Sequence, residues 1–285
     1  MKLARRLLLS SRPLSWINTA FPFAASYFFL GGEVNTFFLV TTLFFLIPYN
    51  FLMYGINDIF DYESDLRNPR KGGLEGALLT PELHRPMLIL VSIINLPFLI
   101  FISLQTLSNL VALGLFWLTI FFVVAYSAKG LRYKEIPFLD STTSSLHFVG
   151  PAIFALAALE KFDLSLLIAL IAFFLWGAAS HAFGAIQDIR ADREAGIASI
   201  ATVLGARVTV RIALSAYMFA GLLLLLLPER FAFASLAALP YLFVVGRELD
   251  ISDENCERAN RGWKLFLMLN FVAGAIISSL LIGPV

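Results

Sequence analysis

The feature of this sequence that most restricts its fold is a series of apolar stretches, each long enough to cross a lipid bilayer. A membrane-spanning helix needs about 20 mostly apolar residues. Nine stretches meet this requirement, at approximately residues 14–30, 36–56, 87–105, 107–127, 137–158, 163–184, 207–227, 231–247 and 263–283. We therefore predict an all-α polytopic membrane protein, a bundle of nine transmembrane helices that forms a single domain over residues 1–285.

The composition agrees with a chain whose solvent is the bilayer. Hydrophobic residues make up 59% of the chain and charged residues only 14%, whereas soluble domains contain roughly 25% charged residues. The net charge of +1 gives no reason to expect nucleic acid as a partner. Cys256 is the only cysteine, which excludes an internal disulfide and a cysteine-based metal site and leaves oxygen atoms as the metal ligands to expect.

The basic residues predict the orientation of the chain, because lysine and arginine concentrate in cytoplasmic loops. If the N-terminus is cytoplasmic, every lysine and arginine except Lys161 and Arg230 falls in or beside a cytoplasmic segment. These segments include polar loops at about residues 57–86, 128–136 and 185–206. The basic, amphipathic segment 1–12 lacks an Ala-x-Ala cleavage signal, so we expect an interfacial helix there. We predict a multi-pass plasma-membrane protein with its N-terminus in the cytoplasm and its C-terminus outside.

Two acidic clusters lie at the cytoplasmic ends of predicted helices. After the second apolar stretch the chain reads Asn57-Asp58-Ile59-Phe60-Asp61-Tyr62-Glu63-Ser64-Asp65. A helix continued through this segment turns about 100° per residue, which places Asp58, Asp61 and Asp65 on one face. Asp188 and Asp192 lie one turn apart at the end of the sixth stretch. The two carboxylate faces form a facing pair if their helices pack together.

The chemistry of these clusters favours a bound metal ion. Ionisable residues at membrane depth are costly and usually functional, and carboxylates gathered on one face repel one another unless a cation joins them. Magnesium commonly binds one or two carboxylates together with substrate phosphates, and the amide oxygen of Asn57 can also act as a ligand. A single cluster could be a solvated helix end, but two on the same predicted side favour a site at which magnesium bridges aspartates to an anionic phosphate.

These residues resemble the UbiA superfamily of intramembrane prenyltransferases over nearly the whole chain. Residues 57–65 match its first motif, N-D-x-x-D-x-x-x-D. Asp188 and Asp192, followed by Arg193, Ala195-Gly196-Ile197 and Thr202-Val203-Leu204-Gly205, are similar to its second motif and the loop after it. Arg12-Pro13 and the nine stretches agree with the family as well. The resemblance implies a helical bundle around a central cavity, with an apolar tunnel open to membrane lipid.

The resemblance also implies roles for individual residues. The metal-site residues would be Asn57, Asp58, Asp61, Asp65, Asp188 and Asp192, with Asp58, Asp61, Asp188 and Asp192 catalytic through Mg2+. The family grips the diphosphate of its isoprenoid substrate with a tyrosine and basic residues after the fourth span, and the first lysine here comes one position earlier than in the usual pattern. The residues expected to bind diphosphate are Lys129, Arg132, Lys134 and Tyr126, with Arg67 and Arg12 as further candidates.

Within the superfamily, three stretches resemble the carotenoid branch, the lycopene elongases: residues 126–141, 146–151 and 181–205. This resemblance implies transfer of a prenyl group, from dimethylallyl diphosphate, to lycopene. His181 precedes Asp188 by two helical turns on the same face, and with His147 it is a candidate for acceptor orientation or proton removal, although each could simply bond a neighbouring helix.

Two other functions remain open from the sequence. A related prenyltransferase could instead act on an aromatic quinone precursor or a glycerol ether lipid. A cation-coupled transporter is a further alternative, because acidic residues in a helical bundle can mark an ion path. The position of the aspartates at the ends of spans, beside long polar loops, disfavours transport.

Overall fold

The structure of the protein is a computed structural model that describes residues 2–62, 66 and 78–282. All regular structure in these residues is helical, which confirms the predicted all-α class. The α-helices are α1 (Lys2–Ser10), α2 (Trp16–Phe29), α3 (Thr36–Leu46), α4 (Pro48–Phe60), α6 (Pro81–Gln105), α7 (Leu110–Ser127), α8 (Leu139–Ala158), α9 (Leu164–Ile186), α10 (Ile189–Ala195), α11 (Ile200–Leu204), α12 (Ala206–Leu224), α13 (Leu239–Gly246) and α14 (Ala259–Ile282). The 3-10 helices are η1 (Pro13–Ser15), η2 (Tyr133–Glu135), η3 (Glu229–Ala238) and η4 (Asp253–Arg258).

The membrane character of these helices agrees with the sequence, although the count differs. Within the described residues, 7 segments are long and apolar enough to cross a membrane: Thr36–Phe60, Pro81–Gln105, Leu110–Ser127, Leu164–Ile186, Ala206–Leu224, Glu229–Gly246 and Asp253–Ile282. The other two predicted stretches overlap α2, which has 14 residues, and α8, which has 20 residues and a polar first half. A polytopic helical membrane protein is confirmed, and the number of nine spans stays a prediction.

The second predicted span is interrupted between α3 and α4. Pro48 starts α4, and proline cannot donate the hydrogen bond that would continue α3. The amide of Asn50 donates to the backbone oxygens of Phe45 and Leu46, both at 3.1 Å, and to the hydroxyl of Thr19 at 2.7 Å. These bonds satisfy carbonyl groups that the interruption leaves without helical partners. The helix is therefore interrupted within the span, and these backbone oxygens still have hydrogen-bond donors.

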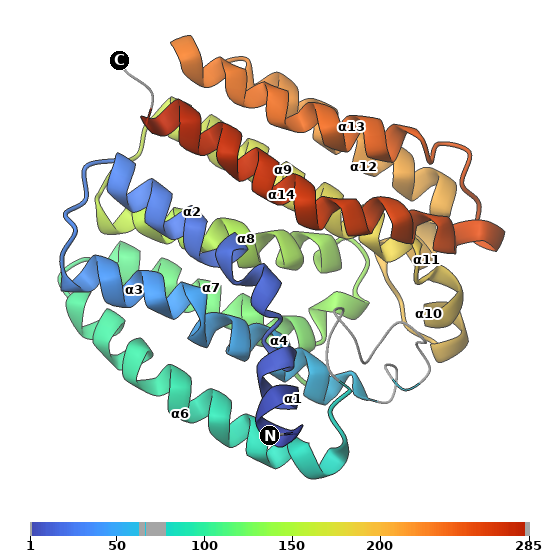
Figure 1. The fold of residues 1–285 in the computed structure, drawn as a ribbon, viewed down its shortest axis with the longest axis horizontal. Helices are drawn as coiled ribbons and strands as arrows, with labels where there is room; N and C mark the ends of the chain where they lie inside the picture. Colours follow the sequence, from blue (N-terminus) through green and yellow to red (C-terminus); the bar gives the residue numbers. More distant parts are fainter. Residues whose placement is uncertain (1, 63–65, 67–77, 283–285) are drawn as a thin grey trace. The chain divides into compact units, whose positions relative to one another are not determined.

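The chain forms two compact units, each with its own hydrophobic core. Unit 1 comprises Met1–Tyr133 and Gly150–Lys161. In this unit α6 lies along α3 and α4, and α1 packs beside α4 (Figure 1). Its core contains a buried aromatic cluster: the Phe154 ring lies 5.9 Å from Phe23 and 5.1 Å from Phe116, measured between ring centroids. Offset and edge-on ring contacts of this kind add to the apolar packing between helices.

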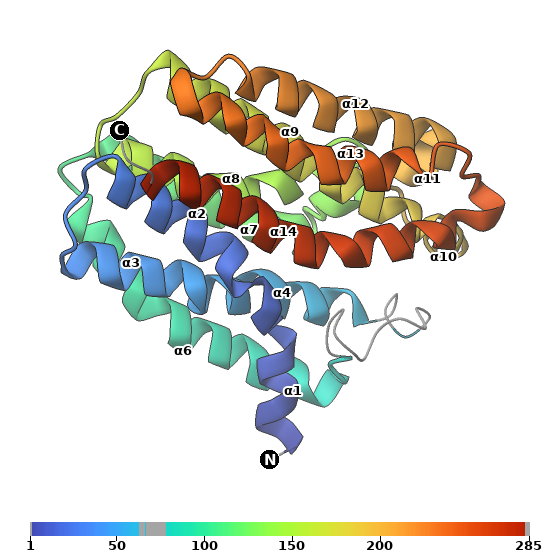
Figure 2. The same ribbon diagram turned by 45° about the horizontal axis from the view of Figure 1, so that its top comes forward.

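Unit 2 comprises Lys134–Val149 and Phe162–Val285. Within it α9 and α12 run side by side along most of their length (Figure 2). The interface of α9 with α14 depends on small residues, because a side chain on Gly184 would collide with the indole of Trp263. Small residues allow close approach of helices in a membrane, where van der Waals packing drives association. The close approach brings the N-terminal end of α14 against the end of α9, next to the second acidic motif.

Candidate functional site

The first acidic motif, in unit 1, is built around a buried carboxylate. Asp58 lies in the last turn of α4 and is only 1% exposed. The Ser10 hydroxyl donates to its Oδ2 at 2.6 Å, and Nη2 of Arg12 lies 3.2 Å from its Oδ1. Because a buried carboxylate is costly unless it is paired and hydrogen-bonded, these partners from the end of α1 hold Asp58 in place.

Arg12 is positioned by several contacts at once. Its guanidinium lies over the ring of Tyr54, 4.2 Å from the ring centroid, and Nη2 also approaches Oδ1 of Asn57 at 3.5 Å. Its backbone has a φ of 48°, in the left-handed region that residues other than glycine seldom adopt. Its Nε is buried without a hydrogen-bond partner among the described residues. A strained backbone that surrounding contacts maintain is common at functional sites.

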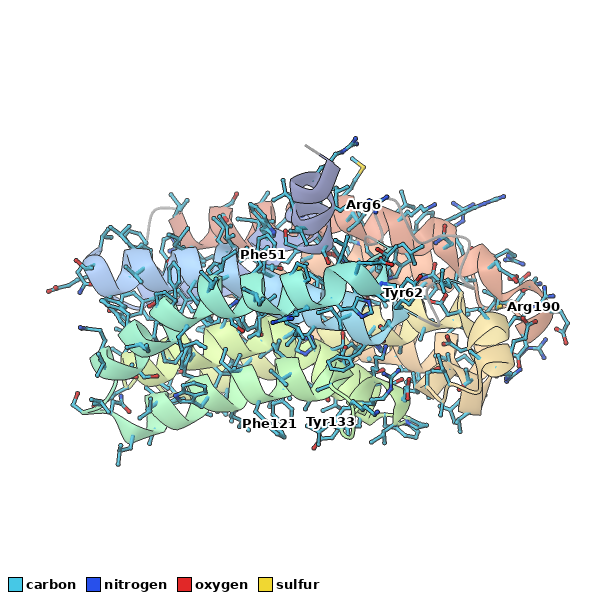
Figure 3. All side chains as sticks on the ribbon, turned by 90° about the horizontal axis from the view of Figure 1, so that it is seen from below. Arg6, Phe51, Tyr62, Phe121, Tyr133 and Arg190 are labelled. Atoms are coloured by element: carbon cyan, nitrogen blue, oxygen red, sulfur yellow. The ribbon has the colours of Figure 1, made fainter. Side chains whose placement is uncertain are left out.

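Asp61 has a comparable arginine partner. It caps the C-terminus of α4, is buried, and lies 3.8 Å from Nη2 of Arg132. Nη1 of Arg132 donates to the backbone oxygen of Phe60 at 3.2 Å, and the Arg132 backbone also has a positive φ, of 43°. The following residue, Tyr133, packs edge-on against Phe121 of α7, and Figure 3 labels both residues. These contacts fix the loop after α7 against the first motif.

The other residues predicted near this motif differ in their contacts and in their exposure to solvent. Asn57 donates through Nδ2 to the Ser127 hydroxyl at 3.0 Å, which ties α4 to the end of α7 beside the half-buried Tyr126. Lys129 is exposed in the following loop. Asp65 and Arg67 lie outside the described residues. Because α4 ends at Phe60, the predicted continuous helix from Asp58 to Asp65 is not observed through Asp61, which is the cap.

The second motif lies in unit 2, where α9 gives way to α10. Asp188 precedes α10 and Asp192 lies one turn later, and both are half-buried. The backbone N–H of Asp192 donates to the backbone oxygen of Asp188 at 2.8 Å. Gly196 ends α10 with a φ of 70°, a conformation that glycine adopts without steric cost. The predicted spacing of one turn between the two carboxylates is therefore observed.

His181 lies in α9, about two turns before the second motif, and contacts the polar first half of α8. Its Nδ1 is 3.1 Å from the hydroxyl of Ser141. The neighbouring Asp140 is fully buried and accepts from the backbone N–H groups of Ser141 and Ile200, both at 2.7 Å. His147, one further turn and a half along α8, is buried. Lys134, also in unit 2, is half-buried before α8.

The donor groups suit magnesium in kind. Carboxylate and amide oxygens are what hard divalent cations prefer, and Asn57, Asp58 and Asp61 supply such oxygens in unit 1, while Asp188 and Asp192 supply them in unit 2. Within either unit, the described residues include no group of three or more histidine, cysteine, aspartate or glutamate side chains that could hold a metal ion. The chemical type of the ligands fits the predicted metal.

Three residues that make polar contacts in or beside the predicted site were not identified from the sequence: Ser10, Ser127 and Asp140. Ser10 and Ser127 are small polar residues whose role depends on which helix end they approach. Asp140 carried a signal that could have been used, because an acidic residue at the start of an apolar stretch is costly unless it is paired. Its pairing with the N-terminus of α11 explains its presence there.

Known proteins are similar to this chain over most of its length. A family profile described as the UbiA prenyltransferase family matches residues 19–271. A protein of Corynebacterium glutamicum named lycopene elongase/hydratase is 49% identical, covering 99% of this chain and 98% of that protein. A Dietzia protein named C50 beta-cyclic carotenoids biosynthesis protein LbtBC is 50% identical, covering 98% of this chain and 65% of that protein.

Solved structures share the fold. A UbiA homologue from Archaeoglobus fulgidus, described as bound to DMAPP and Mg2+, aligns with a TM-score of 0.68 at 18% identity, covering 95% of this chain and 99% of that chain. A UbiA homologue from Aeropyrum pernix aligns with a TM-score of 0.64 at 19% identity, covering 95% and 96% respectively. The family inferred from the acidic motifs is thus confirmed by independent comparison. The chain belongs to the UbiA prenyltransferase family and is a prenyltransferase.

Proposed function

We propose that this enzyme transfers a prenyl group from dimethylallyl diphosphate to lycopene in carotenoid elongation, with Mg2+ as cofactor. The observation that carries the proposal is the 49% identity, over 99% of this chain, to a protein named lycopene elongase/hydratase. Another relative with that name, from Halobacterium salinarum, is 33% identical over 85% of this chain. Because the family is one of enzymes, the hypothesis of a cation-coupled transporter is not retained.

The metal ligands proposed are the acidic and amide side chains of both motifs: Asn57, Asp58, Asp61, Asp65, Asp188 and Asp192. Bound Mg2+ would neutralise the negative charge that grows on the departing diphosphate. The description of the Archaeoglobus fulgidus structure as bound to DMAPP and Mg2+ supports this assignment. The burial and hydrogen bonding of Asp58 support it further, because they preset the position of one carboxylate before a ligand arrives.

The diphosphate is proposed to bind the basic residues of the first motif and the loop after α7. Arg12 and Arg132 are held beside Asp58 and Asp61, and a guanidinium has five N–H donors in a rigid fork that suits phosphate. The buried Nε of Arg12, which lacks a partner among the described residues, is proposed to donate to a diphosphate oxygen. The other proposed contacts come from Tyr126, Lys129, Lys134 and Arg67.

The acceptor step is proposed to involve His181. Attack of a terminal alkene of lycopene on the allylic cation forms a new carbon–carbon bond and leaves a tertiary cation, which loses a proton or takes up water. If Nδ1 of His181 donates to the Ser141 hydroxyl, Nε2 is the ring atom able to accept that proton. His147 is the second candidate for acceptor orientation.

The test uses membranes that contain the full-length protein, lycopene and dimethylallyl diphosphate. We expect release of diphosphate and formation of carotenoids one or two five-carbon units longer than lycopene, detected by mass spectrometry. A parallel reaction supplies an aromatic quinone precursor or a glycerol ether lipid in place of lycopene. Prenylation of either of these, with lycopene left unchanged, would replace the proposed acceptor and keep the reaction type.

A further inference from the structure

The segment that carries the second acidic motif is bound to the start of the C-terminal helix. Four side-chain contacts, all within unit 2, join residues 187–193 to residues 253–260. Neither η4 nor the first turn of α14 belongs to the motifs identified from the sequence. The residues that they contact, Gln187, Arg190 and Arg193, nevertheless lie on both sides of Asp188 and Asp192 in the sequence.

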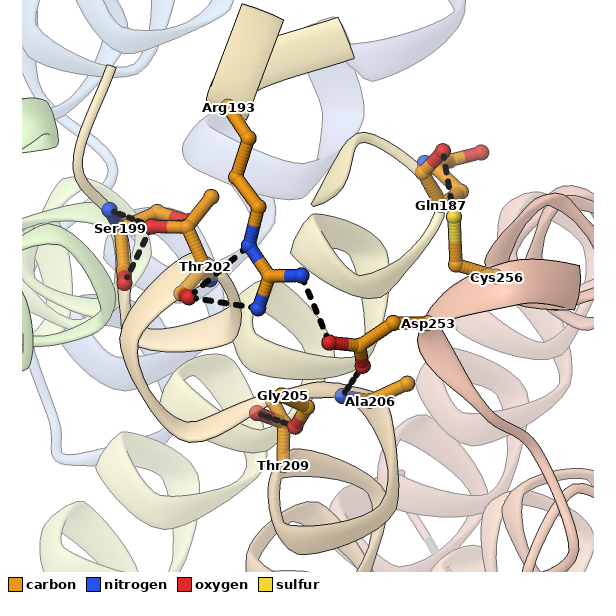
Figure 4. A network of polar contacts seen from close by, with 9 residues as sticks. All are labelled: Gln187, Arg193, Ser199, Thr202, Gly205, Ala206, Thr209, Asp253 and Cys256. Carbon is orange, nitrogen blue, oxygen red and sulfur yellow. Dashed lines mark hydrogen bonds and ion pairs between the residues drawn. The ribbon is translucent and has the colours of Figure 1, made fainter. Parts of the chain in front are cut away.

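One of these contacts is an ion pair between Arg193 and Asp253. Nη1 of Arg193 lies 2.7 Å from Oδ2 of Asp253, while Nε and Nη2 donate to the backbone oxygen of Thr202 at 3.3 and 2.9 Å (Figure 4). Oδ1 of Asp253 accepts from the backbone N–H of Ala206 at 2.7 Å, at the start of α12. One arginine and one carboxylate therefore tie together α10, α11, α12 and η4.

The junction before Asp188 is fixed from the same side. Gln187 is buried; its amide group donates to the backbone oxygen of Gly184 at 2.8 Å, and its Oε1 accepts from Nδ2 of Asn260. Sγ of Cys256 lies 4.0 Å from the backbone oxygen of Gln187. An exposed pair, Arg190 with Glu257 at 3.3 Å, completes the set. Because this pair is exposed to solvent, it contributes little.

Helical geometry separates these contacts from the aspartates. α9 ends at Ile186 and α10 begins at Ile189, so regular helical spacing applies within α10. At about 100° per residue, Arg190 and Arg193 lie about 60° apart on α10. Asp192 falls about 160° from Arg190 and about 100° from Arg193, on a different face, and Asp188 is the N-cap of the helix. The contacts thus hold the Arg190 and Arg193 face of α10, while Asp192 lies on a different face and Asp188 immediately precedes the helix.

We infer that η4 together with Asn260 is a brace that sets the direction of the Asp188 and Asp192 carboxylates, with Asp253 and Asn260 as positioning residues for the metal and the diphosphate. The inference rests on the proposed function, since it assigns the aspartates to a metal. Partners that orient metal-binding side chains typically change metal affinity or activity by about 10–100-fold when removed. Such an effect comes from geometry, because neither Asp253 nor Asn260 need touch the ion.

The decisive variant is Asp253→Asn, with Asp250→Asn as its matched control. Asparagine can still accept from the Ala206 N–H, so the cap of α12 persists while the charge opposite Arg193 is removed. Asp250 is an exposed aspartate three residues earlier that pairs with Arg258, at 2.9 Å, and not with α10. Both variants lose one negative charge from neighbouring positions, and they differ in that the charge of Asp253 pairs with Arg193 of α10 whereas that of Asp250 pairs with Arg258 of η4.

The readouts are metal binding and kinetics of the full-length protein. Mn2+ serves as a paramagnetic probe, because oxygen-ligand sites accept it in place of Mg2+, and its binding is titrated by electron paramagnetic resonance without acceptor. We expect Asp253→Asn to weaken Mn2+ binding, and to raise the Mg2+ concentration for half-maximal turnover, by about 10-fold. We expect Asp250→Asn to match the unaltered protein, and thermal unfolding of both variants to change little.

Two further variants separate the brace from a general loss of structure. Arg193→Gln is expected to weaken Mn2+ binding at least as much as Asp253→Asn, because it removes the same ion pair and also the bonds to the Thr202 backbone oxygen. The double variant should weaken binding no more than Arg193→Gln alone, because the two substitutions share the ion pair. Equal Mn2+ affinity in Asp253→Asn and the unaltered protein, or equal losses in Asp253→Asn and Asp250→Asn, would overturn the brace. If the unaltered protein binds Mn2+ but does not convert lycopene, the proposed acceptor fails while the brace is still tested. If it binds no Mn2+, both proposals are overturned.

Discussion

The two acidic motifs are stabilised in different ways. In unit 1, arginines from distant parts of the chain contact the aspartates directly, and both arginines have left-handed backbones. In unit 2, the residues beside the aspartates carry the contacts: Gln187 and Arg193 are bonded to the start of the C-terminal helix. The carboxylate positions in the first motif therefore depend on pairing of buried charge, whereas those in the second depend on the orientation of a helix. Substitutions should therefore affect stability in the first motif and mainly geometry in the second.

Removal of divalent metal should have the largest effect, and it should act on both motifs alike. We expect a chelator to abolish prenyl transfer in membranes and added Mg2+ to restore it, because the charge on the departing diphosphate would otherwise be uncompensated. Release of diphosphate measures the effect. Turnover that persists in excess chelator would contradict the assignment of either motif to a metal.

Replacement of one aspartate in each motif should separate activity from stability. We expect Asp58→Ala and Asp188→Ala each to lower turnover by more than about 100-fold, beyond the loss typical of outer partners. Only Asp58→Ala should also lower stability, by about 1–3 kcal/mol, because it leaves the Ser10 hydroxyl and Arg12 without their acceptor in a buried site.

Turnover and thermal unfolding, followed by circular dichroism, are measured on the same preparations. Retained activity in either variant would show that the metal site is misassigned. Equal unfolding temperatures in the two variants would contradict the contrast between the motifs.

Substitution of Arg12 should lower turnover to an intermediate degree and should show how much its left-handed backbone conformation destabilises the protein. We expect Arg12→Ala and Arg12→Gly to reduce turnover equally, by about 10-fold or more, because both remove the guanidinium. Arg12→Gly should be the more stable of the two by about 1 kcal/mol, since glycine adopts a φ of 48° without strain. Thermal unfolding and steady-state kinetics distinguish these expectations, and equal stability of the two variants would show that the left-handed backbone costs little.

The polar contact between α8 and α9 should give the smallest effect. We expect Ser141→Ala to reduce turnover about threefold, as loss of a net hydrogen bond of about 0.7 kcal/mol implies. The same variant should change the ratio of the product formed by water addition to the product formed by proton loss. His181→Gln should change that ratio more, and its product pattern is read by mass spectrometry. Normal turnover with an unchanged product pattern in His181→Ala would remove His181 from the proposed mechanism.

The sequence was sufficient to predict the family and the two aspartate motifs, because each depends on local spacing. Asp188 and Asp192 are one turn apart in any helix, and the motif at Asn57 is contiguous. The helix boundary at Phe60 could not be predicted in the same way, because the contacts at this end include the bond from Arg132 to the Phe60 backbone oxygen. That contact joins residues far apart in the chain, which no local pattern specifies.

The amino-acid sequence alone determined that this protein belongs in lipid, because its long apolar stretches require it, and it predicted a cation site from the clustered carboxylates. The tertiary structure decided which residues hold those carboxylates in place. Ser10, Arg12 and Arg132 reach the first motif from separate segments, and Asp253 and Asn260 reach the second from the C-terminal helix. The physical reason is that hydrophobic length and helical spacing are properties of neighbouring residues, whereas the pairing of a buried charge depends on which distant side chain the packed fold brings within hydrogen-bond distance.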